Sequence, residues 1–79
     1  MLYVIEIADT PKRYFAGSIT GGYWQFFPKG NKAIRKITKP EADIALKICN
    51  ANNVEFNLAN VYAIKQITVS KNNRWQVVN

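Results

Sequence analysis

The 79 residues include 11 Lys or Arg against 5 Asp or Glu, which gives a net charge of +6, and 48% of them are hydrophobic. A chain of this length can build one hydrophobic core, so we expect a single domain over residues 1–79 and exclude a second one. Cys49 is the only cysteine and there is no histidine, which excludes an intrachain disulfide, a cysteine zinc cage, imidazole metal sites and the usual catalytic triads.

The start of the chain predicts neither export nor membrane insertion. The sixth residue is an acid, Glu6, and no basic segment precedes the apolar residues, as it would in a signal peptide. No apolar run approaches the length of a membrane span. We therefore expect a cytoplasmic protein without a membrane partner and without a cofactor. The positive charge attracts polyanions such as nucleic acids, but excess lysine also keeps a small apolar protein in solution, and charge alone leaves both interpretations open.

Strand patterns fill the first half of the chain. Tyr3, Ile5 and Ile7 alternate with the residues between them, which is the period of a strand with one buried face. Gly21-Gly22 favours a tight hairpin, and Pro28-Lys29-Gly30-Asn31 has the composition of a turn. Together these signals predict four strands, at residues 2–8, 13–19, 23–27 and 32–37.

A helix is predicted to start after Thr38. Thr38 and Glu41 have the spacing of a capping box, and Pro40 suits a first turn that lacks intrahelical acceptors. The apolar positions of this helix cover an arc of roughly 200°, so we expect it to pack across a sheet. These positions are Ala42, Ile44, Ala45, Leu46, Ile48 and Cys49. Asn52-Asn53 is the predicted stop, because Asn readily adopts the left-handed cap conformation.

Strand patterns return in the second half, at residues 54–58, 61–69 and 75–78, with a hairpin turn predicted at residues 71–74. The predicted fold is α+β: an antiparallel sheet of about five to six strands with one central helix packed on it. The order of elements along the chain is β-β-β-β-α-β-β-β.

The residues with catalytic potential do not form a known constellation. Cys49 falls within the apolar arc of the helix, where a small buried side chain is expected rather than an activated thiolate. Glu41 and Asp43 point to different faces of the helix, and capping and solvation account for them. We expect a protein that is not an enzyme.

The most informative segment is a run of cations without an acid, namely Lys29, Lys32, Arg35, Lys36 and Lys39. It ends at a predicted helix N-terminus, where free N–H groups also favour anions. If residues 32–37 are extended, Lys32 and Lys36 share one side of the strand and could follow phosphates. The alternative is that the lysines protect a sheet edge from aggregation.

Aromatic residues give the remaining candidates for binding. Tyr23 and Trp24 begin an aromatic strand that could stack on unpaired bases, or the strand could be covered on both sides by the core. Trp75 follows the predicted turn at residues 71–74, so its indole could be a partly exposed binding hot spot or a cap on the end of the core.

The segment from Tyr23-Trp24 to Glu41-Ala42 combines an aromatic hairpin, a basic strand ending in Ile37-Thr38 and a Glu-Ala helix. In size and layout it resembles the small orphan proteins of bacteriophages and mobile elements, among which anti-CRISPR proteins are the best understood. The resemblance covers about a third of the chain. It implies a stoichiometric inhibitor that docks on a host defence or nucleic-acid-processing complex. Many anti-CRISPR proteins are acidic mimics of nucleic acid, and the +6 charge departs from that pattern.

We therefore expect a non-enzymatic binding protein, phage-derived, that inhibits a host nucleoprotein complex by touching acidic protein surface or bound RNA or DNA. The alternative is a module that binds nucleic acid directly through the cations between Lys29 and Lys39. A homodimer through an exposed strand edge is compatible with either hypothesis.

Overall fold

The computed structural model describes residues 1–18 and 24–78, without the side chain of Trp24. The described elements are β1 (Leu2–Ile7), β2 (Arg13–Gly17), β3 (Trp24–Pro28), α1 (Lys39–Glu55), β4 (Tyr62–Val69) and β5 (Trp75–Val77). The strands form one antiparallel sheet in the order β3-β2-β1-β4-β5. The predicted α+β fold, a sheet with one helix packed on it, is confirmed.

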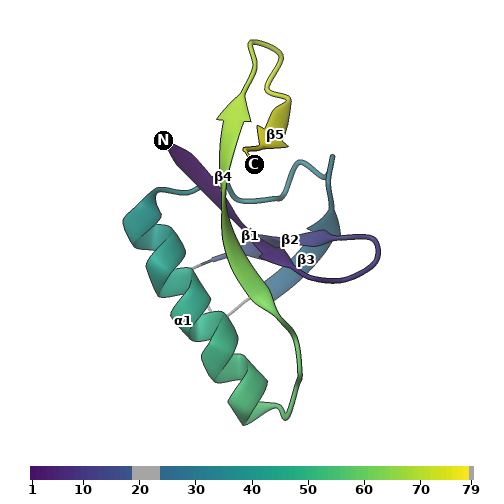
Figure 1. Ribbon diagram of the computed structural model, residues 1–79, viewed down its shortest axis with the longest axis vertical. Coiled ribbons are helices and arrows are strands. Elements are labelled where there is room, and N and C mark those ends of the chain that lie inside the picture. Colours follow the sequence, from purple (N-terminus) through teal and green to yellow (C-terminus); the bar gives the residue numbers. More distant parts are fainter. Residues whose placement is uncertain (19–23, 79) are drawn as a thin grey trace.

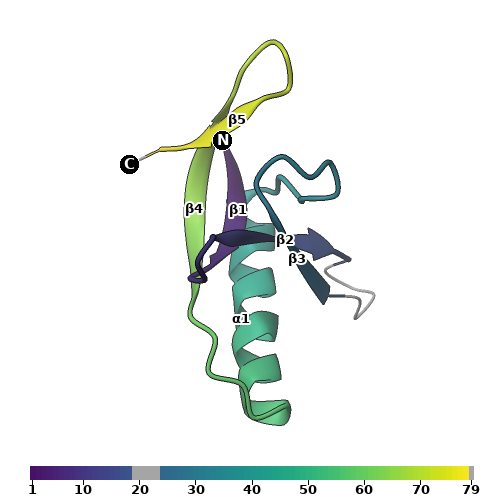
Figure 2. The ribbon, with the colours of Figure 1, turned by 90° about the vertical axis from the view of Figure 1, so that its right-hand side faces the viewer.

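The sheet is strongly twisted, so its two halves run in different directions. β1 and β4 lie along the molecule beside α1, whereas β2 and β3 cross them at a steep angle (Figure 1 and Figure 2). The contacts of α1 with the sheet are concentrated on β1 and β4. The helix therefore covers only part of one face, and the end of the sheet that carries β3 extends past it.

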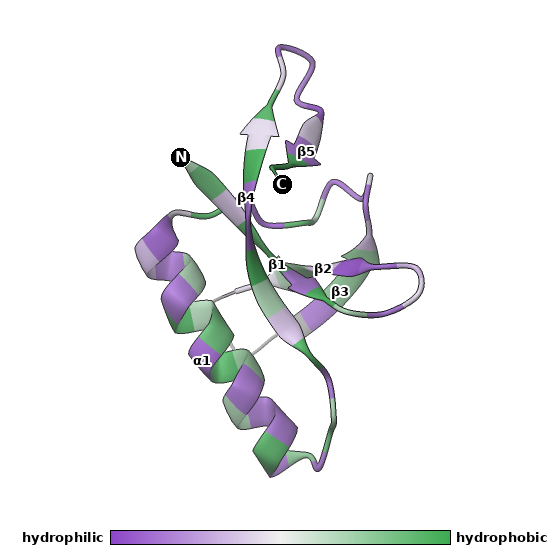
Figure 3. Ribbon diagram, in the orientation of Figure 1, coloured by the Kyte–Doolittle hydropathy of each residue, from purple (hydrophilic) through white to green (hydrophobic). Residues whose placement is uncertain are grey.

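Apolar side chains cover both faces of β1, because its alternate residues belong to two separate clusters. On the helix side, Ile5 and Phe15 pack with Ala42, Ala45 and Cys49 of α1. A second cluster lies on the other face, and its buried members are Val4, Tyr14, Ile34, Ile67 and Trp75. Figure 3 shows green hydrophobic segments on β1 and β4 together with purple hydrophilic ones.

The second cluster surrounds one buried acid, Glu6, which is 6% exposed. The Tyr14 hydroxyl donates to its carboxylate at 3.2 Å, and the Lys12 ammonium lies 3.7 Å from its other oxygen. Burial and the neighbouring Glu6 charge raise the pKa of Tyr14. The acid is thus satisfied by local partners and contributes no exposed negative charge.

The predicted strand at residues 32–37 is wrong. Residues 32–33 form a turn, and only Ile37 makes a bridge, pairing with Tyr3. The Ile37 N–H donates to Tyr3 O at 2.9 Å, and the Arg35 N–H donates to Phe15 O at 3.0 Å. The segment therefore fills the space where β1 and β2 diverge, since β1 and β2 pair only over Glu6–Ile7 and Arg13–Tyr14. Lys32 and Lys36 do not lie on the side of a strand.

The predicted start of the helix is confirmed. The Glu41 carboxylate accepts from the Thr38 N–H at 3.0 Å and from the Thr38 hydroxyl at 2.8 Å. These hydrogen bonds lower the pKa of Glu41. Pro40 stands in the first turn, where its missing N–H costs nothing.

The predicted stop at Asn52-Asn53 is wrong, because α1 continues to Glu55. The Asn53 side chain donates to the Asn60 carbonyl oxygen at 2.7 Å, which ties the last turn to the loop before β4. The left-handed conformation expected of Asn occurs later, at Asn57, with a φ of 53°. The predicted strand at residues 54–58 is wrong for the same reason, since helix and turn occupy it.

The covered arc of α1 is also narrower than predicted. Its buried residues are Ala42, Ala45 and Cys49, whereas Ile44 is 52% exposed. Small side chains facing the sheet bring the helix close to β1 and β4, and these two strands are too narrow a surface to cover the rest of the arc.

Both turns that can be compared with the structure are confirmed. In the first, the Asn31 N–H donates to Pro28 O at 3.3 Å and Gly30 has a φ of 104°. In the second, between β4 and β5, the Ser70 N–H donates to Arg74 O at 2.7 Å and Asn73 has a φ of 59°. The turn predicted at Gly21-Gly22 lies outside the described residues.

Candidate functional site

A basic cleft of about 910 Å³ lies between the loop that joins β3 to α1 and the hairpin that joins β4 to β5. Both segments lie toward the same end of the molecule in Figure 1 and Figure 2. The cationic residues that line the cleft are Lys29, Lys32, Lys36 and Arg74. Amide side chains line it as well, from Asn31, Asn72, Asn73 and Gln76. None of the described residues in its lining is Asp or Glu.

The first wall of the cleft is a loop held in place by local hydrogen bonds and one buried anchor. The Asn31 side-chain oxygen accepts from the Ala33 N–H at 2.8 Å, which tightens the turn that carries Lys32. Ile34 is 4% exposed and packs into the second cluster. With Ile34 buried, the flanking cations Lys32 and Lys36 remain exposed at the cleft.

The second wall is the β4–β5 hairpin. β5 pairs antiparallel with β4, and Val69 lies opposite Trp75. Because Asn73 accepts a positive φ, the chain reverses within residues 70–74 and places Arg74 at the mouth of the cleft.

Trp75 connects the two walls. Its ring meets that of Tyr14 edge to face, with centroids 5.0 Å apart, and the Lys29 ammonium lies 5.2 Å from its ring centroid. At 7% exposure Trp75 is buried, so the interpretation as a partly exposed hot spot is wrong and the interpretation as a cap on the core is confirmed. The cation–π contact fixes Lys29 over the base of the cleft.

The structure brings together three of the five cations predicted from the sequence. Arg35 and Lys39 do not line the cleft. The Arg35 guanidinium donates to Gly17 O at 2.8 Å, and the Lys39 ammonium pairs with Asp43 at 2.9 Å, which raises the pKa of Lys39. Lys29, Lys32 and Lys36 form no ion pair within the described part of the chain.

Arg74 and its neighbouring amides were missed by the sequence reasoning. The turn at residues 71–74 was predicted, but nothing in the local pattern indicates that it lies beside the loop of residues 29–36. Tyr23, a predicted stacking residue, lies outside the described residues, as does the side chain of Trp24. Phe26 and Phe27 of the same strand pack into the first and second clusters respectively, so at these positions the strand is covered on both sides.

Comparison with protein-family models, with curated proteins and with solved structures finds no match to this chain.

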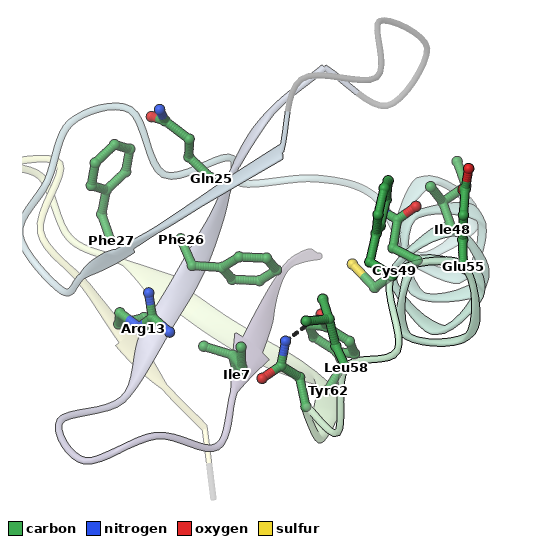
Figure 4. A pocket seen from close by; sticks show the side chains of 13 residues that line it. Ile7, Arg13, Gln25, Phe26, Phe27, Ile48, Cys49, Glu55, Leu58 and Tyr62 are labelled. Atoms are coloured by element: carbon green, nitrogen blue, oxygen red, sulfur yellow. Dashed lines mark hydrogen bonds between the residues drawn. The ribbon is translucent and has the colours of Figure 1, made fainter.

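A second hollow, the apolar groove, has a volume of about 930 Å³ and lies where the sheet extends past α1. Figure 4 shows Phe26 reaching from β3 toward Ile48 and Cys49 of α1, with Ile7, Leu58 and Tyr62 around it. The rings of Phe26 and Tyr62 are 5.5 Å apart. Arg13 and Glu55 are the charged residues in its lining, and Arg13 pairs with Asp9.

The groove does not offer an activated nucleophile. Burial raises the pKa of the Cys49 thiol to about 11, so the thiol is protonated at neutral pH. Among residues 1–18 and 24–78, no three His, Cys, Asp or Glu side chains are grouped so that they could hold a metal ion. Within the same residues, no helix is both long enough and apolar enough to cross a membrane.

Proposed function

We propose that this chain is a non-enzymatic binding protein whose basic cleft holds the phosphate backbone of a single-stranded nucleic acid. The observation that carries the proposal is the convergence of Lys29, Lys32, Lys36 and Arg74, from two segments far apart in the sequence, on one concave site without an acid among its described lining residues. Cations placed together in this way repel one another unless an anion lies between them.

The side chains of the cleft suit phosphate in complementary ways. Lysine ammonium groups act as mobile point charges, and the Arg74 guanidinium can donate two parallel hydrogen bonds to one phosphate. The amides of Asn72, Asn73 and Gln76 can donate to phosphate or bond to base edges.

The shape of the cleft favours a single strand over a duplex. Duplex recognition needs an element that protrudes into a groove about 12 Å wide, whereas this site is hollow and bounded by two loops. Trp75 is buried beneath Lys29, so its ring face is not free to stack on a base. We therefore expect binding that depends little on sequence and strongly on salt.

The second candidate is the inhibitor of a host nucleoprotein complex implied by the resemblance to anti-CRISPR proteins. The same cleft favours it, because RNA or DNA exposed on such a complex offers the same phosphates. The two candidates differ in one property: a direct nucleic-acid-binding module binds a free oligonucleotide, whereas an inhibitor that recognises the assembled complex binds the complex alone.

Fluorescence anisotropy with a labelled random single-stranded oligonucleotide tests the proposal. With four phosphate contacts, the logarithm of the affinity should fall with the logarithm of the salt concentration with a slope of about −3. Changing Lys32→Gln together with Lys36→Gln removes two contacts. The slope should then approach about −1.4, and the affinity at about 0.1 M salt should fall about twentyfold.

The matched control is Lys47→Gln with Lys65→Gln, which removes the same charge away from the cleft. Its affinity should stay within about threefold of the unchanged protein, since only long-range attraction is lost. Equal losses in the two double variants would contradict a role for the cleft. No binding to a free oligonucleotide at low salt would reject the first candidate and leave the second.

A further inference from the structure

The end of the molecule near the loop between α1 and β4 exposes four large apolar side chains within residues 54–61 (Figure 1). We call Val54, Phe56, Leu58 and Val61 the apolar ridge. They are 85%, 62%, 47% and 66% exposed respectively. Phe56 and Leu58 also line the apolar groove, so the ridge and the groove adjoin. Several large apolar residues exposed close together in the chain are typical of an interaction site, whereas single exposed apolar residues are not.

The exposed area of the whole chain points in the same direction. Its accessible surface is 5428 Å² for a mass of 9.0 kDa. A monomeric protein of this mass exposes about 4,850 Å². The excess of about 600 Å² is close to the roughly 600 to 800 Å² that each partner buries in a small specific interface.

The distribution of charge is compatible with a second copy of the chain as the partner. Eight of the eleven cations are outside the ion pairs of the described residues, and the basic cleft and its two loops hold most of them. The groove instead has one cation, Arg13, and one anion, Glu55, in its lining. Two copies that meet at this end therefore do not bring like charges together, although each has a net charge of +6.

We propose that a second copy of this chain covers the apolar groove in a twofold-symmetric dimer, with the ridge of each copy lying in the groove of the other. Twofold symmetry requires a surface that is complementary to itself, and an exposed apolar segment beside a hollow lined mostly by apolar residues meets that requirement. Symmetry also makes every contact twice, so Arg13 in the groove of each copy can approach Glu55 of the other.

The dimer has a consequence for binding that rests on the proposed function. The loop between α1 and β4, which contributes to the groove, and the β4–β5 hairpin, which forms one wall of the basic cleft, lie toward opposite ends of a molecule 39 Å long (Figure 1), so the dimer holds its two basic clefts apart. One long polyanion could then occupy both clefts, and the second attachment would be intramolecular.

Sedimentation equilibrium of the full chain tests the dimer without any ligand. The unchanged protein should approach twice its 9.0 kDa mass as its concentration rises, with a weak dissociation constant in the micromolar range or above. Changing Val54→Lys with Phe56→Lys places like charges on the ridge. The dimer dissociation constant should rise at least about tenfold, while circular dichroism keeps the signal of the folded protein.

The matched control is Val69→Lys with Val78→Lys, two exposed apolar residues at the other end of the chain's sheet, which adds the same charge. This control should dimerise like the unchanged protein. A chain that is monomeric at the highest concentration reached would overturn the proposal. So would a dimer that persists in the ridge variant, because it would have to form elsewhere, such as along the outer edge of β3. Neither result bears on oligonucleotide binding, so this proposal and the proposed function can fail separately.

Discussion

The basic cleft and the apolar groove are hollows of nearly equal volume, about 910 Å³ and about 930 Å³, but they are built in opposite ways. The base of the cleft is the buried Trp75, and its walls are charged loops. The groove has a half-buried Phe26 beneath it and an exposed apolar ridge beside it. The apolar residue beneath the cleft is therefore covered, whereas the groove leaves large apolar side chains exposed.

The difference arises because one helix covers only part of a five-stranded sheet. α1 covers β1 and β4 and leaves the region over β3 open. On the opposite face, Ile34 and Trp75 are buried in the second cluster. The cations of the basic cleft lie on the segments that contain these two residues. Water can solvate the cleft when it is empty, but the groove lowers its free energy only when something apolar covers it.

Truncating the aromatic residue beneath each hollow should lower the free energy of unfolding by different amounts. Trp75→Ala removes the buried ring that contacts Tyr14 and Lys29, and we expect it to lower the free energy of unfolding by about 3 to 5 kcal/mol. Phe26→Ala should cost roughly half as much in dilute solution, because Phe26 is only partly buried there. Urea denaturation followed by circular dichroism measures both changes. Equal losses would contradict the description of the groove as the less covered region.

Several features of the fold could be predicted from local signals in the sequence. The alternation at residues 2–8 and 61–69 predicted β1 and β4, and the capping residues Thr38 and Glu41 fixed the start of α1. Gly30 and Asn73 marked turns because each adopts a positive φ at low cost.

Other features depend on tertiary contacts that no local pattern contains. Val54, Phe56 and Leu58 have the spacing of a strand, yet α1 continues to Glu55, and the Asn53 side chain donates to the Asn60 carbonyl oxygen instead of marking the end of the helix. The cleft could be predicted only in part, since Arg74 meets Lys32 and Lys36 through the strand order of the sheet.

A smaller effect of pH should distinguish the groove from the cleft. The pKa of Cys49 beside the groove is raised to about 11 from 9.0. The folded thiol keeps its proton when the unfolded thiol has lost it, so stability is lost as pH rises from about 9 to about 11. We expect a loss of about 2 to 3 kcal/mol from this group.

Chemical denaturation at several pH values measures this dependence, with Cys49→Ala as the control. The variant should keep only the weaker dependence that comes from Tyr14 and Lys39, whose pKa values are also raised in the folded protein. An unchanged pH dependence in Cys49→Ala would show that the thiol does not titrate with folding.

The smallest effect concerns the contact between Lys29 and Trp75. Lys29→Met keeps an apolar stem over the ring but removes the cation, and we expect a loss of about 0.5 to 1 kcal/mol in stability. Oligonucleotide affinity at about 0.1 M salt should fall about fivefold, since one phosphate contact is lost. Lys71→Met, in the hairpin but outside the lining of the cleft, should change both quantities less. Chemical denaturation measures the stability of the two variants, and fluorescence anisotropy on the same samples measures their affinity for the oligonucleotide.

Binding of phosphate in the basic cleft can be observed residue by residue in a nuclear magnetic resonance titration of the isotope-labelled chain with a short single-stranded oligonucleotide. Backbone amide shifts should change in residues 29–36 and 71–76 and leave the apolar ridge unmoved. Changes centred on residues 52–62, or no changes at saturating oligonucleotide and low salt, would contradict it.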